Sequence, residues 1–277
     1  STALNRTHRP GRRGGSRLLR LLDPLLGRMN LGAKLMTLAV VLFVPLAVLL
    51  VTVITRQGRD LQTTQAEKFG AIQVEQLHEL TVELQAHRGQ TAMAINGNSA
   101  AETARQATRG KLTQHLEATE AALQAAPAAE LTGLWSPLRA EVQRLISGRG
   151  ATEAGPAFKE HTVAIQQLGA LSLLAAEKSG LLLDPEGPTY FLMEISVERL
   201  NAWTEAVAQI RGVTSSALAR GEWTAQDSLR LAAPMGELTT ALTNAQRRAE
   251  ALERSGEPRP AGWAEAQQAT AGYVRQV

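Results

Sequence analysis

The sequence contains no cysteine, which excludes a disulfide framework, a thiolate metal site and a cysteine nucleophile. Aromatic residues are scarce, at 4%, whereas Ala, Leu, Gln and Glu are abundant, and this balance favours helix over sheet. No segment shows a convincing strand-like alternation of apolar and polar residues. The 44% content of hydrophobic residues argues against disorder along the whole length. The sequence therefore predicts an all-α protein.

A strong net charge is also absent, but the total of +3 combines two segments of opposite sign. Residues 1–34 carry eight basic side chains and one acidic side chain, which gives +7, and the remaining 21 basic and 25 acidic side chains give −4. A basic arm of this kind suits either nucleic acid or an anionic membrane surface. The segment that follows the arm decides between them.

The segment from Leu35 to Thr55 has 21 residues and no charged side chain. A helix of this length spans roughly 30 Å, the thickness of the bilayer core. We weigh two other interpretations, the buried helix of a soluble core and a cleaved signal peptide. The apolar run is longer than a signal peptide needs and ends in Val-Ile-Thr-Arg rather than in small residues. Because Pro45 is also better tolerated in a membrane helix, we expect an uncleaved membrane anchor.

The basic arm then becomes the cytoplasmic flank of this anchor under the positive-inside rule. We therefore expect an inner-membrane protein with a cytoplasmic N-terminus and residues 56–277 outside the cytoplasm, and no nucleic-acid partner. Ser16–Asn30 is interpreted either as an amphipathic helix on the inner membrane surface or as a basic flank without that role.

Helical periodicity and helix breakers divide the rest of the chain. Asn96-Gly97 ends the helix that continues from the anchor, and each later break contains Pro or Gly. We expect one interruption, near Ser136-Pro137, within the third helix. The expected helices run to about Ile95 and then cover about Ala100–Ala125, Ala128–Ile146, Pro156–Leu183, Thr189–Arg220 and Thr224–Glu253, with a last one from about Trp263.

An internal repeat is visible around two Arg-Gly pairs, Arg88-Gly89 and Arg211-Gly212. Small residues, a helix-ending glycine and a later helix with a tryptophan near its start follow each pair; chance similarity of Ala-rich helices is the alternative. The repeat predicts two stacked four-helix bundles, 56–183 and 184–277, the second incomplete. We accordingly expect the chain to be a piece of a longer protein.

Three arginines fall on apolar helix faces when the residues are placed at 100° per residue. Arg88 lies within a stripe that includes Leu77, Leu80 and Leu84. In the later helix Arg211 and Arg199 fall on two adjoining apolar stripes, and the opposite side is polar. This polar side holds Glu194, Glu198, Asn201, Glu205 and Gln209.

A buried guanidinium costs several kcal/mol unless a negative group compensates it. One possibility is an internal Arg–Glu pair, or a side chain that extends to water at the bundle end. The other is an external anion, since the planar guanidinium suits a planar oxyanion. On the second possibility Arg88, Arg211 and Arg199 are the candidate ligand-binding residues.

No catalytic or metal signature accompanies them. Glu75 and His78 form one Glu-x-x-His motif, whereas a di-iron bundle needs two and further carboxylates. The five histidines show no zinc spacing, and phosphate-loop, Gly-x-Ser-x-Gly and kinase motifs are missing. We expect no catalytic residue, no metal and no cofactor, and interpret the four tryptophans as packing residues.

The segment Leu84-Gln85-Ala86-His87-Arg88-Gly89 resembles the Gln-x-Glu-Arg-Gly signature of nitrate- and nitrite-sensing (NIT-type) domains, with His87 in place of the Glu. Leu183-Asp184-Pro185 with Tyr190, Leu192 and Met193 is similar to a segment in the outer domains of methyl-accepting chemotaxis proteins and histidine kinases. The resemblance implies a bacterial chemoreceptor or sensor kinase, a homodimer with two helical bundles per subunit, and an anion held by Arg88 and Arg211.

The main hypothesis is therefore the non-enzymatic sensory portion of a membrane receptor for chemotaxis or two-component signalling. It would bind a small-molecule ligand, for which an oxyanion such as nitrate or nitrite is the leading candidate. One alternative is a membrane-tethered structural or protein-binding helical module, which internal Glu partners for the arginines would favour. Another is the sensor part of a histidine kinase or diguanylate cyclase.

Overall fold

The computed structural model describes residues 30–183 and 187–276. Nearly all of the Ser16–Asn30 segment lies outside the described residues, as do residues 184–186, between the expected helices Pro156–Leu183 and Thr189–Arg220. The described chain is helical and contains no strand, so the predicted all-α class is confirmed. Residues 1–61 and 62–277 form two separate units, and each is described by itself.

In the first unit, the described residues belong to the beginning of α2 (Leu31–Ile95). Every large hydrophobic side chain between Leu35 and Ile54 is at least 49% exposed. The Thr52 and Thr55 hydroxyls donate to backbone carbonyls one turn earlier, at 2.7 Å and 2.9 Å, which satisfies them without water. The run is long and apolar enough to cross a membrane, and the described chain buries none of it.

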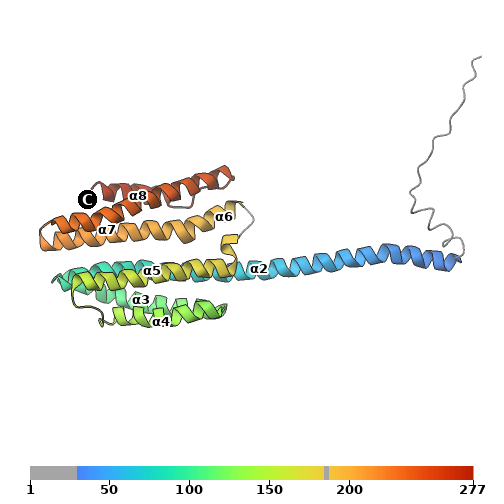
Figure 1. Ribbon diagram of the computed structural model, residues 1–277, viewed down its shortest axis with the longest axis horizontal. Coiled ribbons are helices and arrows are strands. Elements are labelled where there is room, and N and C mark those ends of the chain that lie inside the picture. Colours follow the sequence, from blue (N-terminus) through green and yellow to red (C-terminus); the bar gives the residue numbers. More distant parts are fainter. Residues whose placement is uncertain (1–29, 184–186, 277) are drawn as a thin grey trace, which may run out of the picture. The chain divides into compact units, whose positions relative to one another are not determined.

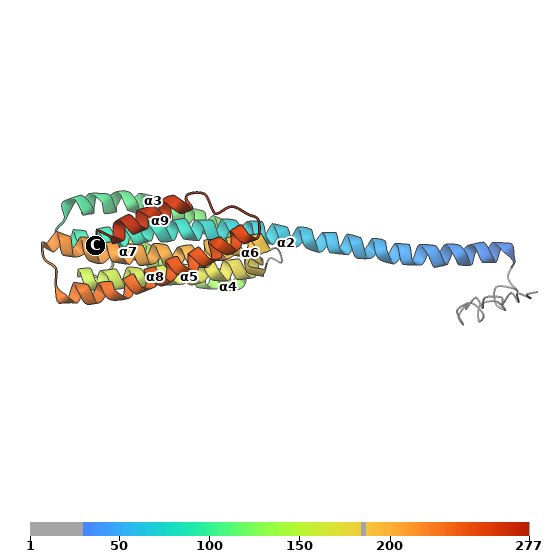
Figure 2. The same cartoon turned by 90° about the horizontal axis from the view of Figure 1, so that it is seen from above.

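The second unit contains the rest of α2 and all later helices (Figures 1 and 2). Gly97, at φ 88°, ends α2 in a left-handed conformation that favours glycine, and Asn98 caps the next helix by accepting from the Ala101 N–H at 2.9 Å. The elements that follow are α3 (Ser99–Ala125), α4 (Ala129–Ile146), α5 (Ala154–Ser179), the 3₁₀ turn η1 (Leu181–Leu183), α6 (Gly187–Glu194), the π-helical turn η2 (Ile195–Arg199), α7 (Leu200–Arg220), α8 (Ala225–Arg254) and α9 (Trp263–Val274).

Two sequence-based boundaries were wrong. Pro137 lies inside α4, which is continuous, because a proline removes only one helical hydrogen bond and its neighbours can retain the helix. The predicted Pro156–Leu183 helix instead ends at Ser179, where Gly180 takes a left-handed φ of 86°. The π-helical turn at Ile195–Arg199 was not predicted, since its wider winding leaves no simple residue signature.

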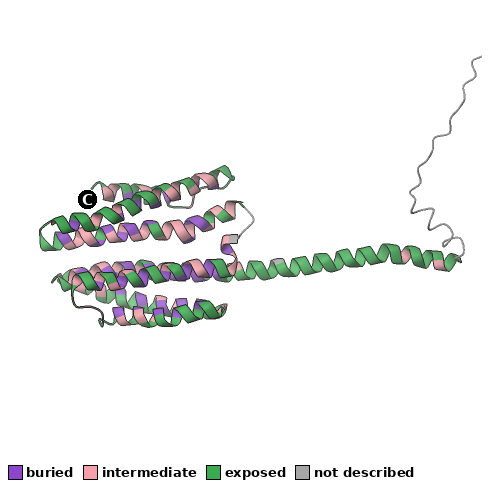
Figure 3. Ribbon diagram, viewed as in Figure 1, coloured by how far each residue is buried: buried purple, intermediate pink, exposed green. Residues whose placement is uncertain are grey.

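Two hydrophobic clusters stabilise the second unit. The first is built mainly from α2, α3, α4 and α5, and includes Leu80, Trp135 and Leu168. The second is built mainly from α7, α8 and α9 and includes Trp203 and Trp263, whose rings meet edge to face with centroids 5.6 Å apart. Buried residues concentrate on the facing sides of these helices (Figure 3). The site described next lies where the helices of the two clusters meet.

Candidate functional site

Arg88 is the largest fully buried side chain among the described residues, with 0% exposure. Its Nη1 donates to Glu205 Oε1 at 2.6 Å, and its Nη2 donates to Glu205 Oε2 at 3.2 Å. This two-pronged geometry is the strong form of an Arg–carboxylate pair. The prediction that Arg88 lies on a buried face is confirmed. Its compensating charge comes from within the chain, because Glu205 of α7 pairs with Arg88 of α2.

Amide and hydroxyl groups complete this ion pair. Gln85 and Gln209 each donate a side-chain N–H to the Glu205 carboxylate, at 2.9 Å and 2.7 Å, and Thr162 accepts from Arg88 Nη1 at 3.0 Å. The Nε of Arg88 has no hydrogen-bond partner. The Arg88 guanidinium and the Glu205 carboxylate thus receive hydrogen-bond partners from α2, α5 and α7. A buried polar network with paired members of this kind holds the three helices together at this point.

Phe158 of α5 forms the apolar side of this arrangement. The guanidinium carbon of Arg88 lies 4.6 Å from the centre of the Phe158 ring, a cation–π distance. On α7, a Cβ added at Gly212 would meet Phe158 Cε2 at 2.5 Å. The ring can therefore lie beneath Arg88 only because residue 212 has no side chain.

Next to Arg88, two buried histidines form a hydrogen-bonded pair. His161 Nδ1 lies 2.7 Å from the Ala157 carbonyl oxygen, to which only an N–H can donate, and His161 Nε2 is then left to accept from His87 Nδ1 at 2.9 Å. Burial first, and His161 second, lower the pKa of His87 to about 3. Burial also lowers the pKa of His161. Both rings are therefore neutral at pH 7.

Arg199 lies at the end of the π-helical turn and is 27% exposed. It pairs with Glu194 and, at 3.2 Å, with Glu198. Arg248 of α8 also pairs with Glu194, at 2.8 Å. The helical projection had placed Glu194 on the opposite, polar side from Arg199. That projection was wrong because a π-helical turn adds a residue to one turn and shifts the angular phase of the helix.

Arg211 is exposed, whereas the apolar stripe predicted a position that faces the core. The residues of that stripe are mostly only partly buried, as Thr204 and Val207 show, and the core side of α7 is the neighbouring one with Trp203 and Ile210. Arg211 lines a shallow hollow with Trp223 and Tyr273. The two Arg-Gly pairs therefore differ: one arginine is buried and paired, and the other faces solvent.

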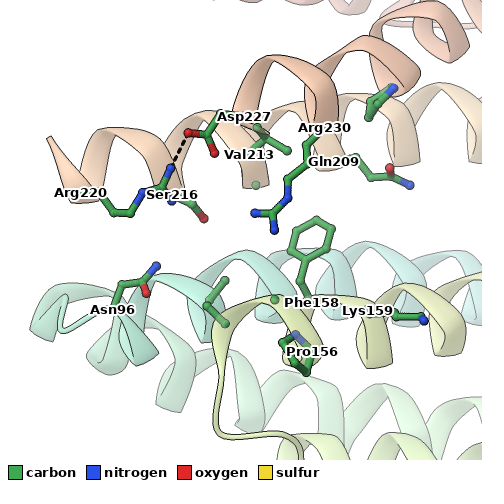
Figure 4. A pocket seen from close by; sticks show the side chains of 15 residues that line it. Asn96, Pro156, Phe158, Lys159, Gln209, Val213, Ser216, Arg220, Asp227 and Arg230 are labelled. Atoms are coloured by element: carbon green, nitrogen blue, oxygen red, sulfur yellow. Dashed lines mark hydrogen bonds and ion pairs between the residues drawn. The ribbon is translucent and has the colours of Figure 1, made fainter. Parts of the chain in front are cut away.

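A pocket with a volume of about 720 Å³ lies between α2 and α5 on one side and α7 and α8 on the other. Phe158 and Gln209 line it, and both also contact the Arg88–Glu205 pair. Figure 4 shows the Phe158 ring standing between α5 and the guanidinium of Arg230. The remaining lining residues are Ala92, Asn96, Ala154, Gly155, Pro156, Lys159, Gly212, Val213, Ser216, Arg220, Asp227, Arg230 and Pro234.

None of the three predicted ligand-binding arginines lines the pocket. Arg88 lies behind the Phe158 ring, which forms part of the pocket wall. Sequence reasoning missed Phe158, Gln209, Arg220 and Arg230. Phe158 and Arg230 lie in the first turns of α5 and α8, just after loops, and Arg220 ends α7; no periodic signal tells which helices meet there. A weak signal existed in Gly212, because a glycine within a helix often marks a close approach.

The histidine of the Glu75–His78 motif contacts a neighbouring helix. His78 Nδ1 lies 2.9 Å from Asn201 Oδ1 of α7, and within the described ranges no group of three His, Asp or Glu side chains is placed to hold a metal ion. His78 thus belongs to the polar contacts that join α2 to α7.

Comparison of the chain with protein-family models, with curated proteins and with solved structures finds no match. The resemblance of the Arg88 segment to nitrate- and nitrite-sensing domains therefore stays a prediction.

Proposed function

We propose that the chain is the sensory portion of a membrane-anchored receptor, in which a small ligand binds between the two hydrophobic clusters. The observation that carries the proposal is the pocket of about 720 Å³ whose walls Phe158 and Gln209 also contact the buried Arg88–Glu205 pair. Its volume lies within the usual range of small-molecule sites, roughly 300–1,000 Å³. A ligand there would touch the groups that join α2 to α7.

Membrane anchoring is supported by the first unit. An unbroken run of exposed apolar side chains such as this one is costly in water and requires a partner of low polarity. The segment is of bilayer length, and α2 contains both this run and Arg88. In this proposal the two hydrophobic clusters correspond to two helical bundles outside the cytoplasm, and two copies of the chain associate.

Sensing requires two arrangements of the helices that bind the ligand with different affinity. The contact between α2 and α7 supports such a mechanism because it consists of a few polar contacts, made by His78, Gln85 and Arg88. Hydrogen bonds and ion pairs have two discrete states, made and broken. A ligand that contacts Gln209 would change the hydrogen bond from Gln209 to the Glu205 carboxylate. It would thereby favour either the made or the broken state of the Arg88–Glu205 pair.

A second candidate is a structural or protein-binding helical module without a ligand. The pairing of Arg88 with Glu205 favours it, since the chain already supplies the charge for which an oxyanion was expected. Nitrate binding at Arg88 would have to displace Glu205. On the sensory proposal, Arg88 therefore acts as a connection between helices, and the ligand occupies the adjoining pocket.

Thermal melting of the full chain in detergent separates the two candidates. A ligand at a hundredfold excess over its dissociation constant should stabilise the folded state by about 2.7 kcal/mol. Nitrate, nitrite and a series of small carboxylates are the first compounds to test. A rise in Tm with at least one of them supports the sensory proposal. No rise with any of them would leave the ligand-free module as the better account.

A further inference from the structure

The charges around the pocket are not balanced. Lys159, Arg220 and Arg230 line it together with one acid, Asp227. Asp227 is 2% exposed and is already engaged: it accepts from the Thr224 N–H at 2.9 Å, from the Thr224 hydroxyl at 2.7 Å and from Arg220 Nη2 at 2.6 Å. These contacts hold the pKa of Asp227 at about 2. The acid therefore neutralises Arg220 and stays ionised in its capping role.

Lys159 and Arg230 are the cations that remain. Both are exposed, and within the part of the chain that the structure describes neither makes a hydrogen bond or ion pair. In Figure 4 the Arg230 side chain extends from α8 into the space above the Phe158 ring, whereas Lys159 lies apart from it. A guanidinium in this position offers a planar set of donors for an anionic group.

The walls near Arg230 are apolar. Phe158, Val213 and Pro234 line the pocket, with Ala92 and Pro156 at its α2 and α5 sides. An inorganic ion such as nitrate would leave these surfaces in water, and a nucleotide or polyphosphate would need more than one free cation at the same point. A flat apolar body would instead bury the walls while its charged group reaches Arg230.

We infer that the pocket binds a small carboxylate with an aromatic or similarly compact apolar body, with Arg230 holding the carboxylate and Phe158 packing against the body. This inference rests on the ligand pocket of the proposed function and names the class of ligand. Arg230 donates two parallel N–H···O bonds to the two carboxylate oxygens. Asn96 and Ser216 supply further polar groups at the pocket wall.

Benzoate is the probe, and benzamide is its neutral counterpart of the same shape. The full chain in detergent should bind benzoate at least tenfold more tightly than benzamide by titration calorimetry, because one charge-assisted pair is worth a factor of this size. Arg230→Gln should weaken benzoate binding about tenfold or more and leave benzamide binding unchanged. Equal affinity for the two probes, or no benzoate binding, would overturn the inference.

Arg247→Gln is the matched control, because Arg247 is exposed on the same helix, outside the pocket lining, and its loss changes the net charge equally. Benzoate affinity should be unchanged in this variant. An equal loss in both variants would mean that overall charge, and not the pocket, holds the anion. Arg230→Lys, which keeps the charge and loses the planar fork, should give an intermediate affinity.

Photolabelling with 4-azidobenzoate locates the site independently of any variant. Labelled peptides should come from the segments around Phe158 and Arg230, and benzoate should compete; labelling confined to other segments would refute the assignment. The proposed function can fail separately. If benzoate binds in the pocket without any change in the α2–α7 spacing, this inference stands and the sensory role fails. If nitrate changes that spacing and benzoate does not bind, the sensory role stands and this inference fails.

Discussion

Two stretches of α2 reverse the usual rule of burial. Residues 35–55 are apolar, yet each large side chain from Leu35 to Ile54 is at least 49% exposed. In the stretch from Gln73 to Thr91, by contrast, polar side chains are buried, including Arg88 and His87 at 0% exposure. The difference shows that a side chain is buried where another part of the chain offers it a suitable partner. Arg88 has Glu205 within the chain, whereas the apolar stretch has no counterpart in the described residues, and in the proposed function a membrane covers it.

The largest effect should come from charging the apolar stretch. Leu46→Lys with Leu49→Lys places two charges within it, at a cost of roughly 2.5–3.5 kcal/mol each at the centre of a membrane helix. We expect the variant chain to leave the membrane fraction of expressing bacteria. Leu229→Lys, at a position 76% exposed in the second unit, should remain in that fraction. Retention of the doubly charged variant in membranes would contradict the anchor.

Removing the partner of the buried cation should have the next largest effect. Glu205→Ala leaves Arg88 buried and unpaired, which should reduce the free energy of unfolding by about 3–5 kcal/mol. Urea denaturation of the full chain in detergent measures it. The double variant Arg88→Met/Glu205→Leu should recover most of the loss, because apolar residues can replace a buried ion pair. A single variant as stable as the parent would show that the pair is not needed.

Two glycines from the two Arg-Gly pairs should respond in opposite directions. Gly212→Ala drives a Cβ to within 2.5 Å of Phe158, and such overpacking should cost about 1–3 kcal/mol. Gly89→Ala meets nothing within 4 Å and should stabilise the helix by up to about 1 kcal/mol. Thermal melting distinguishes the signs; a Gly212→Ala variant as stable as the parent would contradict the packing of Phe158 against Gly212.

A smaller effect should appear on acidification. His87 is neutral in the folded chain, with its pKa lowered from 6.5 to about 3 mainly by burial, so the unfolded chain binds a proton first as the pH falls below 6.5. This histidine should therefore reduce stability by about 1.4 kcal/mol per pH unit between pH 6 and pH 5. His87→Gln should show a shallower slope in urea titrations at those two pH values, and an unchanged slope would assign the pH effect elsewhere.

The sequence predicted the features that depend on local pattern. Asn96-Gly97 ends α2, and α4 ends at Ile146, both as expected. The phase of Leu77, Leu80 and Leu84 correctly placed Arg88 on a buried face. These features follow from helix geometry and from the conformational freedom of glycine, which act over a few residues.

The partners could not be predicted in the same way. Glu205 belongs to the polar side of α7, and periodicity alone does not tell that this side faces α2 instead of solvent. The π-helical turn at Ile195–Arg199 also broke the projection that placed Arg199 opposite Glu194, and Arg211 was assigned to a stripe beside the one that faces the core. The pocket lies between helices that are far apart in sequence, so Phe158 and Arg230 meet only once the clusters have packed.

The most direct test of the sensory proposal is the distance between α2 and α7 with and without ligand. Spin labels can be attached at Val82→Cys and Ala202→Cys, two exposed positions, without interference because the chain has no other cysteine. With saturating benzoate or nitrate, confirmed as bound by calorimetry, the distance distribution should shift, and the shift should be lost in Arg88→Met/Glu205→Leu. An unchanged distribution with ligand bound would contradict the proposal.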